Sequence, residues 1–124
     1  MNKILLVDDH ADIRRLIRMT LGKNYEVHEA DNGLTGLEMA RTLRPDVVVL
    51  DVMMPGGVSG LEVLDTIKGD PQLIQTRVIM VTARGQMLDY EDGMGRGADA
   101  YFVKPFSPLQ VVACIKDLLN ASGT

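Results

Sequence analysis

The sequence contains no tryptophan and a single cysteine, Cys114, among its 124 residues. One cysteine excludes a disulfide within the chain and a zinc site built from several thiolates, and it is typical of proteins in a reducing compartment. No uninterrupted apolar run approaches the ~18 residues that a membrane span needs. The first residues turn acidic at Asp8-Asp9 after one short apolar run, which predicts no secretory signal. We therefore expect a cytoplasmic protein without membrane association.

Positive charge is also scarce. The chain has 13 lysines and arginines against 17 aspartates and glutamates, which gives a net charge of −4 and a pI near 5.0. Direct binding to nucleic acid relies on cations that neutralise phosphates, so we expect none from this chain. The hydrophobic fraction of 46% is ordinary for a globular protein. The length predicts one domain over residues 1–124, with 121–124 as a frayed tail.

Short apolar runs alternate with longer segments of helical period. The runs at residues 4–7, 47–50 and 78–81 are continuous and rich in β-branched side chains, which is typical of strands covered on both faces. Residues 101–103 predict a further strand, and residues 25–30 alternate as an edge strand does.

Helical spacing of apolar residues predicts five helices, around residues 13–21, 34–43, 61–67, 86–96 and 108–119. Gly22 is expected to end the first of them. The last begins with the capping box Ser107-Pro108-Leu109-Gln110. A strand followed by a helix, five times over, predicts a doubly wound α/β fold with a five-stranded parallel sheet.

Polar side chains follow the expected strands at the point where each ends. Asp8-Asp9 follow the first strand, Asp51 the third, Thr82-Ala83 the fourth and Lys104-Pro105 the fifth. Ligands of an open α/β sheet bind beyond the carboxyl ends of its strands. We therefore expect three carboxylates, a hydroxyl and an ammonium group to meet in one crevice.

Three carboxylates in one crevice need compensation. Two like charges ~4 Å apart repel by about 4 kcal/mol at an effective dielectric constant near 20, and Lys104 offsets only part of this. Either some carboxylates are protonated or a divalent cation lies among them. We expect no histidine or cysteine near these oxygens, so the donor set favours Mg²⁺. Asp51 is the candidate nucleophile, which would form an aspartyl phosphate, and Asp8 and Asp9 would hold the metal.

Four stretches together resemble the receiver domains of bacterial two-component response regulators, the chemotaxis regulators among them. The likeness spans essentially the whole chain and implies a flavodoxin-like (βα)5 fold with strand order 2-1-3-4-5. The stretches that carry it are Leu5-Leu6-Val7-Asp8-Asp9, Asp51-Val52-Met53-Met54-Pro55, Val81-Thr82-Ala83-Arg84 and residues 97–106, which read GADAYFVKPF.

The resemblance implies a role for each acidic residue. Asp51 would accept a phosphoryl group from a phosphohistidine on a histidine kinase or a histidine phosphotransfer protein. Asp9 would bind Mg²⁺ directly and Asp8 through water, with Asp51 and the backbone carbonyl of Met53 as further ligands.

The resemblance also implies how the signal leaves the site. Lys104, Thr82 and Ala83 would stabilise the phosphoryl group, and Thr82 with Tyr101 would form the switch. The Lys104–Pro105 bond would be cis. The fourth helix, fifth strand and fifth helix would form the output face for an unidentified downstream protein, on a monomer or a weak homodimer.

The sequence departs from the family pattern after Asp51. Four residues, 56–59, separate Pro55 from Gly60, one more than is usual, so we expect a looser loop beside an intact metal site. Met53 and Arg84, expected to flank the phosphoryl group, are neither acids nor amides that position water. We therefore expect slow loss of the phosphoryl group.

Two alternatives remain open, and a third, a flavin carrier, fails on charge. Asp8-Asp9 can be read as a helix cap without a metal. Asp51 can be read as the nucleophile of a phosphatase, although Met53 stands where such enzymes carry a second acid. A flavin carrier of this topology would need a Ser/Thr/Gly-rich loop where the chain has Asp8-Asp9-His10. Arg14, Arg15 and Arg18 are expected to form a solvated helix face.

Overall fold

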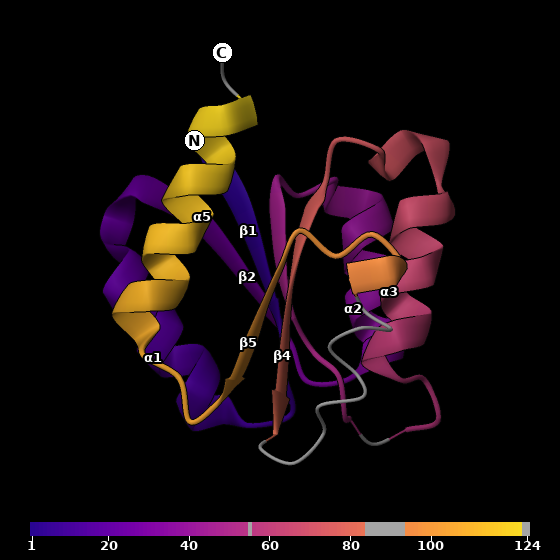
Figure 1. Cartoon of the computed structure of the whole chain (residues 1–124), viewed down its shortest axis with the longest axis horizontal. Coiled ribbons are helices and arrows are strands. Elements are labelled where there is room, and N and C mark those ends of the chain that lie inside the picture. The colour runs from indigo at the N-terminus through magenta and orange to yellow at the C-terminus, as the bar shows by residue number, and fades with distance from the viewer. Residues whose placement is uncertain (55, 84–93, 123–124) are drawn as a thin grey trace.

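The computed structural model describes residues 1–54, 56–83 and 94–122 of the chain. The described residues form five strands, and a helix follows each of β1, β2, β3 and β5 along the sequence (Figure 1). The strands are β1 (Asn2–Val7), β2 (Tyr25–Ala30), β3 (Val47–Asp51), β4 (Arg77–Ala83) and β5 (Ala100–Lys104). The helices are α1 (Ala11–Leu21), α2 (Gly33–Leu43), α3 (Gly60–Gly69) and α5 (Pro108–Ser122), with 3₁₀ turns at Gly22–Asn24 and Pro71–Leu73.

The sheet is parallel, with the strand order β2-β1-β3-β4-β5, which confirms the expected topology. The alternating segment β2 lies at an edge, as its pattern predicts. β1 begins at Asn2, two residues before its apolar run, because Asn2 and Lys3 continue the pairing with Tyr25 and Glu26. Pairing therefore extends the strand beyond the part that hydrophobicity marks.

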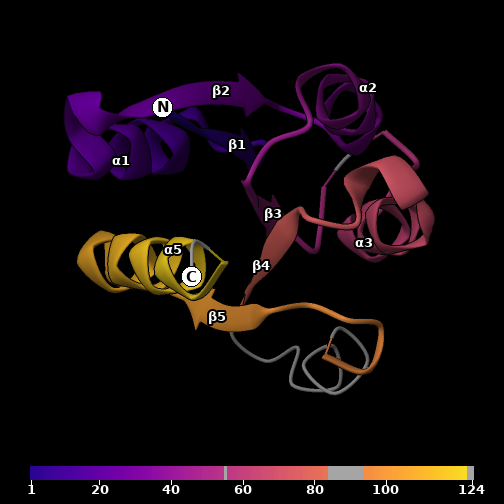
Figure 2. The ribbon, with the colours of Figure 1, turned by 90° about the horizontal axis from the view of Figure 1, so that it is seen from above.

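Two hydrophobic cores lie on opposite faces of the sheet. Figure 2 shows α1 and α5 on one side and α2 and α3 on the other. Alternate residues of β1 enter different cores: Leu5 packs with residues of α2 and α3, whereas Leu6 packs with residues of α1 and α5. Burial on both faces explains why the strand sequences are continuous apolar runs.

Local sequence fixes the helix ends. Gly22 follows α1 with φ +74°, a conformation that glycine adopts without strain. The Asn32 side chain accepts a hydrogen bond from the Thr35 amide at 2.8 Å, and the Ser59 side chain accepts one from the Glu62 amide at 3.2 Å. These side-chain caps place the starts of α2 and α3 at the carboxyl edge of the sheet.

The C-terminal part of the chain differs from expectation in length. Helix α5 continues to Ser122, so residues 121 and 122 are helical, and fraying of the chain end stays a prediction. Residues 123 and 124 lie outside the described part. Of the helix expected around 86–96, Met94 and Gly95 are helical, while residues 86–93 lie outside the described residues. No helix within the described ranges is long and apolar enough to cross a membrane.

Candidate functional site

The expected site residues converge at the carboxyl edge of the sheet. Asp8 follows β1, Asp51 ends β3, and Lys104 ends β5 in register with Ala83 of β4. The strands are parallel, so their ends meet although the residues are up to 96 positions apart in the sequence. The register of the sheet therefore assembles the crevice that the sequence predicts.

Lys104 bridges two buried carboxylates. Its Nζ lies 3.1 Å from Oδ2 of Asp8 and 3.2 Å from Oδ2 of Asp51. The side chains of Asp8 and Asp51 are only 9% and 4% exposed. One ammonium group thus faces two carboxylates that have little access to water and offsets only part of their repulsion, in line with the charge argument from the sequence.

The electrostatics of the crevice are set by burial and by crowding. Burial and the Asp8 carboxylate raise the pKa of Asp51 to about 6, although Lys104 and the Met53 amide oppose the shift. Burial disfavours the Lys104 ammonium, but the carboxylates of Asp51 and Asp8 outweigh it and raise the pKa of Lys104 above its usual value. The site therefore carries excess negative charge around a lysine that stays protonated.

The donor set fits a divalent cation. Asp8, Asp9, His10 and Asp51 each offer one ligand atom, and these atoms lie within 4.8 Å of one another. Three carboxylate oxygens match the preference of Mg²⁺ for oxygen ligands. The Met53 amide donates a hydrogen bond to Oδ1 of Asp51 at 3.2 Å, whereas its carbonyl as a metal ligand stays a prediction.

His10 is the residue that the sequence reasoning missed. Its Nδ1 lies 2.9 Å from Oδ1 of Asp8 and 3.2 Å from Oδ1 of Asp9, so the expectation of a site without nearby histidine is wrong. His10 is also the N-cap residue of α1, which means that Asp8 and Asp9 do not cap that helix. The signal was present in the sequence, because His10 directly follows the two aspartates.

Thr82 and Tyr101 lie on the same face of the sheet. Tyr101 pairs with Met80, and Thr82 follows Met80 by two positions, so both side chains project to the face covered by α2 and α3. Thr82 is buried, and the Tyr101 ring packs against that core with its hydroxyl out of contact with solvent. Their role as a switch stays a prediction. The Lys104–Pro105 bond is cis, as the resemblance implies.

The loop after Asp51 is packed closely at two glycines, Gly60 against the backbone of Asp51 and Gly33 against the backbone of Val58. A Cβ on Gly60 would lie 2.1 Å from the carbonyl oxygen of Asp51, and a Cβ on Gly33 would lie 2.6 Å from the carbonyl oxygen of Val58. Gly56 and Gly57 adopt φ angles of +96° and +82°. The loop with its extra residue therefore packs against α2 at Val58. The sequence, which led us to expect a looser loop, did not predict this contact. Pro55 lies outside the described residues.

Two of the three arginines of α1 brace the edge strand. Arg14 Nε and Arg18 Nε each lie 3.0 Å from a carboxylate oxygen of Glu29 on β2. Arg14 also donates to the Asp8 carbonyl, and Arg18 donates to the Val27 carbonyl at 2.9 Å. The expected solvated face is thus wrong for Arg14, whose side chain is only 16% exposed, whereas Arg15 and Arg18 are exposed as expected.

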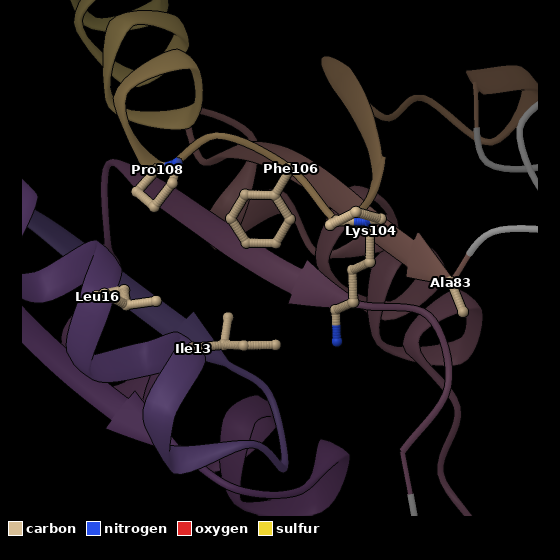
Figure 3. A pocket seen from close by; sticks show the side chains of 7 residues that line it. Ile13, Leu16, Ala83, Lys104, Phe106 and Pro108 are labelled. Atoms are coloured by element: carbon tan, nitrogen blue, oxygen red, sulfur yellow. The ribbon is translucent and has the colours of Figure 1, made fainter.

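An apolar pocket of about 420 Å³ lies beside the crevice. Figure 3 shows Ile13 and Leu16 of α1 facing Phe106 and Pro108 across it. Lys104, whose ammonium group pairs with Asp8 and Asp51, also lines it. Leu16 is 53% exposed although its spacing predicts a core position. The helical period could not distinguish a residue that faces the core from one that lines this pocket.

The family model for the response regulator receiver domain matches residues 4–116, and the chain belongs to this family. It is 44% identical over 122 residues to the transcriptional regulatory protein ResD of Bacillus subtilis (strain 168), which covers 98% of this chain and 49% of ResD. It is 41% identical over 120 residues to SrrA of Staphylococcus aureus, which covers 96% of this chain and 48% of SrrA. The chain thus spans about half the length of these curated relatives.

Solved structures agree with this assignment. The CheY-like receiver domain protein from Methanospirillum hungatei JF-1 has a TM-score of 0.90 at 27% identity, covering 99% of this chain and 97% of that one. The chemotaxis protein CheY4 of Vibrio cholerae has a TM-score of 0.85 at 32% identity, covering 95% and 98%. The chain is therefore a signalling domain of a two-component response regulator, consistent with a phosphoacceptor switch, and the phosphatase alternative is not favoured.

The names of two relatives bear on one expectation. ResD and SrrA are called transcriptional regulatory proteins. Their names therefore do not support the expected absence of nucleic acid among the partners. For these 124 residues alone, the absence of direct nucleic-acid binding stays a prediction.

Proposed function

We propose that Asp51 is the phosphoacceptor of this receiver domain and that its modification is the signal the domain transmits. The observation that carries the proposal is the Lys104 ammonium, which lies within 3.2 Å of both Asp51 and Asp8 in a buried crevice. A buried carboxylate beside a fixed cation is suited to attack phosphorus, because the charge that develops on the phosphoryl oxygens meets a donor already in place.

The donor is a phosphohistidine of a histidine kinase or a phosphotransfer protein. An Oδ atom of Asp51 attacks phosphorus, the bond between phosphorus and the imidazole nitrogen breaks, and the imidazole leaves with the bonding electron pair and takes up a proton. Lys104 and the Thr82 hydroxyl then donate to the phosphoryl oxygens, with Ala83 beside them. A Mg²⁺ ion held by Asp8, Asp9 and Asp51 supplies positive charge at the phosphoryl oxygens when it is bound.

Rearrangement of Thr82 transmits the presence of the phosphoryl group to Tyr101 on β5. Thr82 and Tyr101 share one face of the sheet, so movement of the hydroxyl toward the crevice changes the space available to the tyrosine ring. β5 carries Tyr101 and leads to α5, and these two elements, with the helix expected around residues 86–96, form the output face for a downstream protein. The switch shifts a two-state equilibrium in a domain that is monomeric or weakly dimeric.

The test is incubation with Mg²⁺ and a small acyl phosphate, followed by intact-mass analysis. We expect one phosphoryl adduct on the wild type, none on Asp51→Asn, and one on the matched control Asp12→Asn, because Asp12 is exposed on α1. An adduct that survives Asp51→Asn contradicts the proposal. Continuous release of inorganic phosphate without accumulation of the adduct would instead indicate a phosphatase.

A further inference from the structure

The imidazole of His10 lies among the carboxylates of the crevice. Its Nδ1 is 2.9 Å from Oδ1 of Asp8 and 3.2 Å from Oδ1 of Asp9. A ring nitrogen of His10 also lies within 4.8 Å of the ligand atom of Asp51. The crevice therefore presents three oxygen donors and one nitrogen donor rather than oxygens alone.

These separations are those of neighbouring ligands on one ion. Six ligands at about 2.1 Å from a small divalent ion place adjacent donor atoms about 3 Å apart and opposite ones about 4.2 Å apart. The two distances from Nδ1 match the shorter value. The overall spread of 4.8 Å exceeds the larger value by about 0.6 Å, which rotations of the side chains can remove.

A nitrogen donor changes which ion the crevice prefers. Mg²⁺ takes carboxylates, carbonyls and water, whereas imidazole suits first-row transition ions such as Co²⁺, Ni²⁺ and Zn²⁺. We propose that the crevice also binds a divalent transition ion, with His10 Nδ1 as a ligand beside Asp8, Asp9 and Asp51. The inference rests on the proposed Mg²⁺ site, because the two ions share these carboxylates and exclude each other.

The chain supplies an internal comparison in its other histidine. His28 Nε2 lies 2.9 Å from Oε2 of Glu26, so it also has a carboxylate neighbour. His28 belongs to no cluster of three or more candidate metal ligands among the residues that the structure describes. A pairing with one carboxylate is thus common to both histidines, and the convergence of three carboxylates distinguishes His10.

The variant His10→Asn separates nitrogen ligation from the other roles of this position. Asparagine is a favoured N-cap residue, so α1 keeps its start, and its amide oxygen leaves a hard donor beside the carboxylates. His28→Asn is the matched control for the loss of a histidine. Asp9→Asn removes a carboxylate that both ions are expected to use.

The experiment titrates each variant of the full chain with Co²⁺ and with Mg²⁺ by calorimetry. We expect His10→Asn to weaken Co²⁺ binding by about tenfold or more and Mg²⁺ binding by less than about threefold. His28→Asn leaves both affinities unchanged, and Asp9→Asn weakens both. In the proton NMR spectrum of the Co²⁺-loaded wild type, we expect a hyperfine-shifted imidazole N–H signal that His10→Asn lacks and His28→Asn keeps.

The results distinguish this inference from the proposed function. If His10→Asn leaves Co²⁺ affinity unchanged, or weakens Co²⁺ and Mg²⁺ equally, histidine ligation is wrong while the Mg²⁺ site stands. If the wild type binds neither ion, or if Asp9→Asn changes neither affinity, both the inference and the proposed Mg²⁺ site are overturned. Co²⁺ binding that excess Mg²⁺ cannot displace would also contradict the inference, because it would place the ion elsewhere.

Discussion

Gly60 lies directly against the backbone of Asp51. A Cβ at Gly60 would come 2.1 Å from the Asp51 carbonyl oxygen and 2.7 Å from the Cα of Val52, and the Gly60 amide donates to the Val52 carbonyl at 2.9 Å. The start of α3 is thereby fixed to the end of the strand that carries Asp51. No side chain larger than hydrogen fits without movement of that strand.

Gly60→Ala is expected to lower the free energy of unfolding by about 2–3 kcal/mol, because the atoms that must move belong to the backbone of Asp51 and Val52. The matched control is Gly69→Ala, at the other end of the same helix, where a Cβ meets no atom within 4 Å. That substitution is expected to be neutral or stabilising. Urea denaturation measures both, and equal free energies for the two variants would contradict the steric argument.

Lys104→Met is expected to slow formation of the Asp51 adduct by about tenfold or more. Removal of the ammonium leaves Asp8 and Asp51 facing one another and withdraws a donor from the phosphoryl oxygens. Lys116→Met is the control, because Lys116 is exposed on α5. The rate is measured by intact-mass analysis with Mg²⁺ and an acyl phosphate; an unaltered rate in Lys104→Met would argue against its role.

Asp51→Asn is expected to stabilise the protein in a pH-dependent manner when divalent ions are chelated. The pKa of Asp51 is about 6 in the folded protein and near 3.8 when the group is exposed, so the unfolded state ionises first as the pH rises. The carboxylate therefore destabilises the fold above pH 6, by about 1–3 kcal/mol, and has no effect below about pH 4.

Thermal or urea denaturation between pH 4 and 8 measures this difference. The gain of Asp51→Asn over the wild type should be largest above pH 6 and should vanish toward pH 4. Asp12→Asn, at an exposed position, serves as the control. A gain that is independent of pH would show that ionisation of Asp51 is not its cause.

Asp99→Ala is expected to destabilise the domain by about 2 kcal/mol or more. The Asp99 carboxylate accepts from Lys68 Nζ at 2.9 Å and from the Val78 amide at 2.8 Å, and it lies 3.4 Å from Arg77 Nη1. Its loss leaves half-buried donors without this partner. The control is the exposed Asp117 on α5, where Asp117→Ala is expected to change the free energy of unfolding by less than about 0.5 kcal/mol.

The sheet could be predicted from the sequence because every buried strand is a continuous apolar run. The strand ends were harder to place, since β1 includes Asn2 and Lys3 only through their pairing with β2. The carboxylates and Lys104 could be predicted because each directly follows or ends a strand. Position relative to the sheet, rather than any pairwise motif, carried that prediction.

Contacts between distant segments could not be read from the sequence. The approach of Gly33 to Val58 depends on how the loop after β3 meets α2, and neither residue has a local signature for it. The pairing of Arg14 and Arg18 with Glu29 depends on the packing of α1 against β2. For His10, its position directly after Asp8 and Asp9 was a signal in the sequence, but the spacing of residues does not specify the rotamer that brings the ring against both carboxylates.

The hydrogen bond from Arg18 to the Val27 carbonyl affects the tendency of copies of this molecule to aggregate at high concentration. An exposed outer strand offers free carbonyl groups that another chain can use as a template for aggregation. Arg18 occupies the Val27 carbonyl, and the charged side chains of Glu26 and Glu29 project from the same strand. A single arginine on the neighbouring helix thus helps to keep each copy separate from the next.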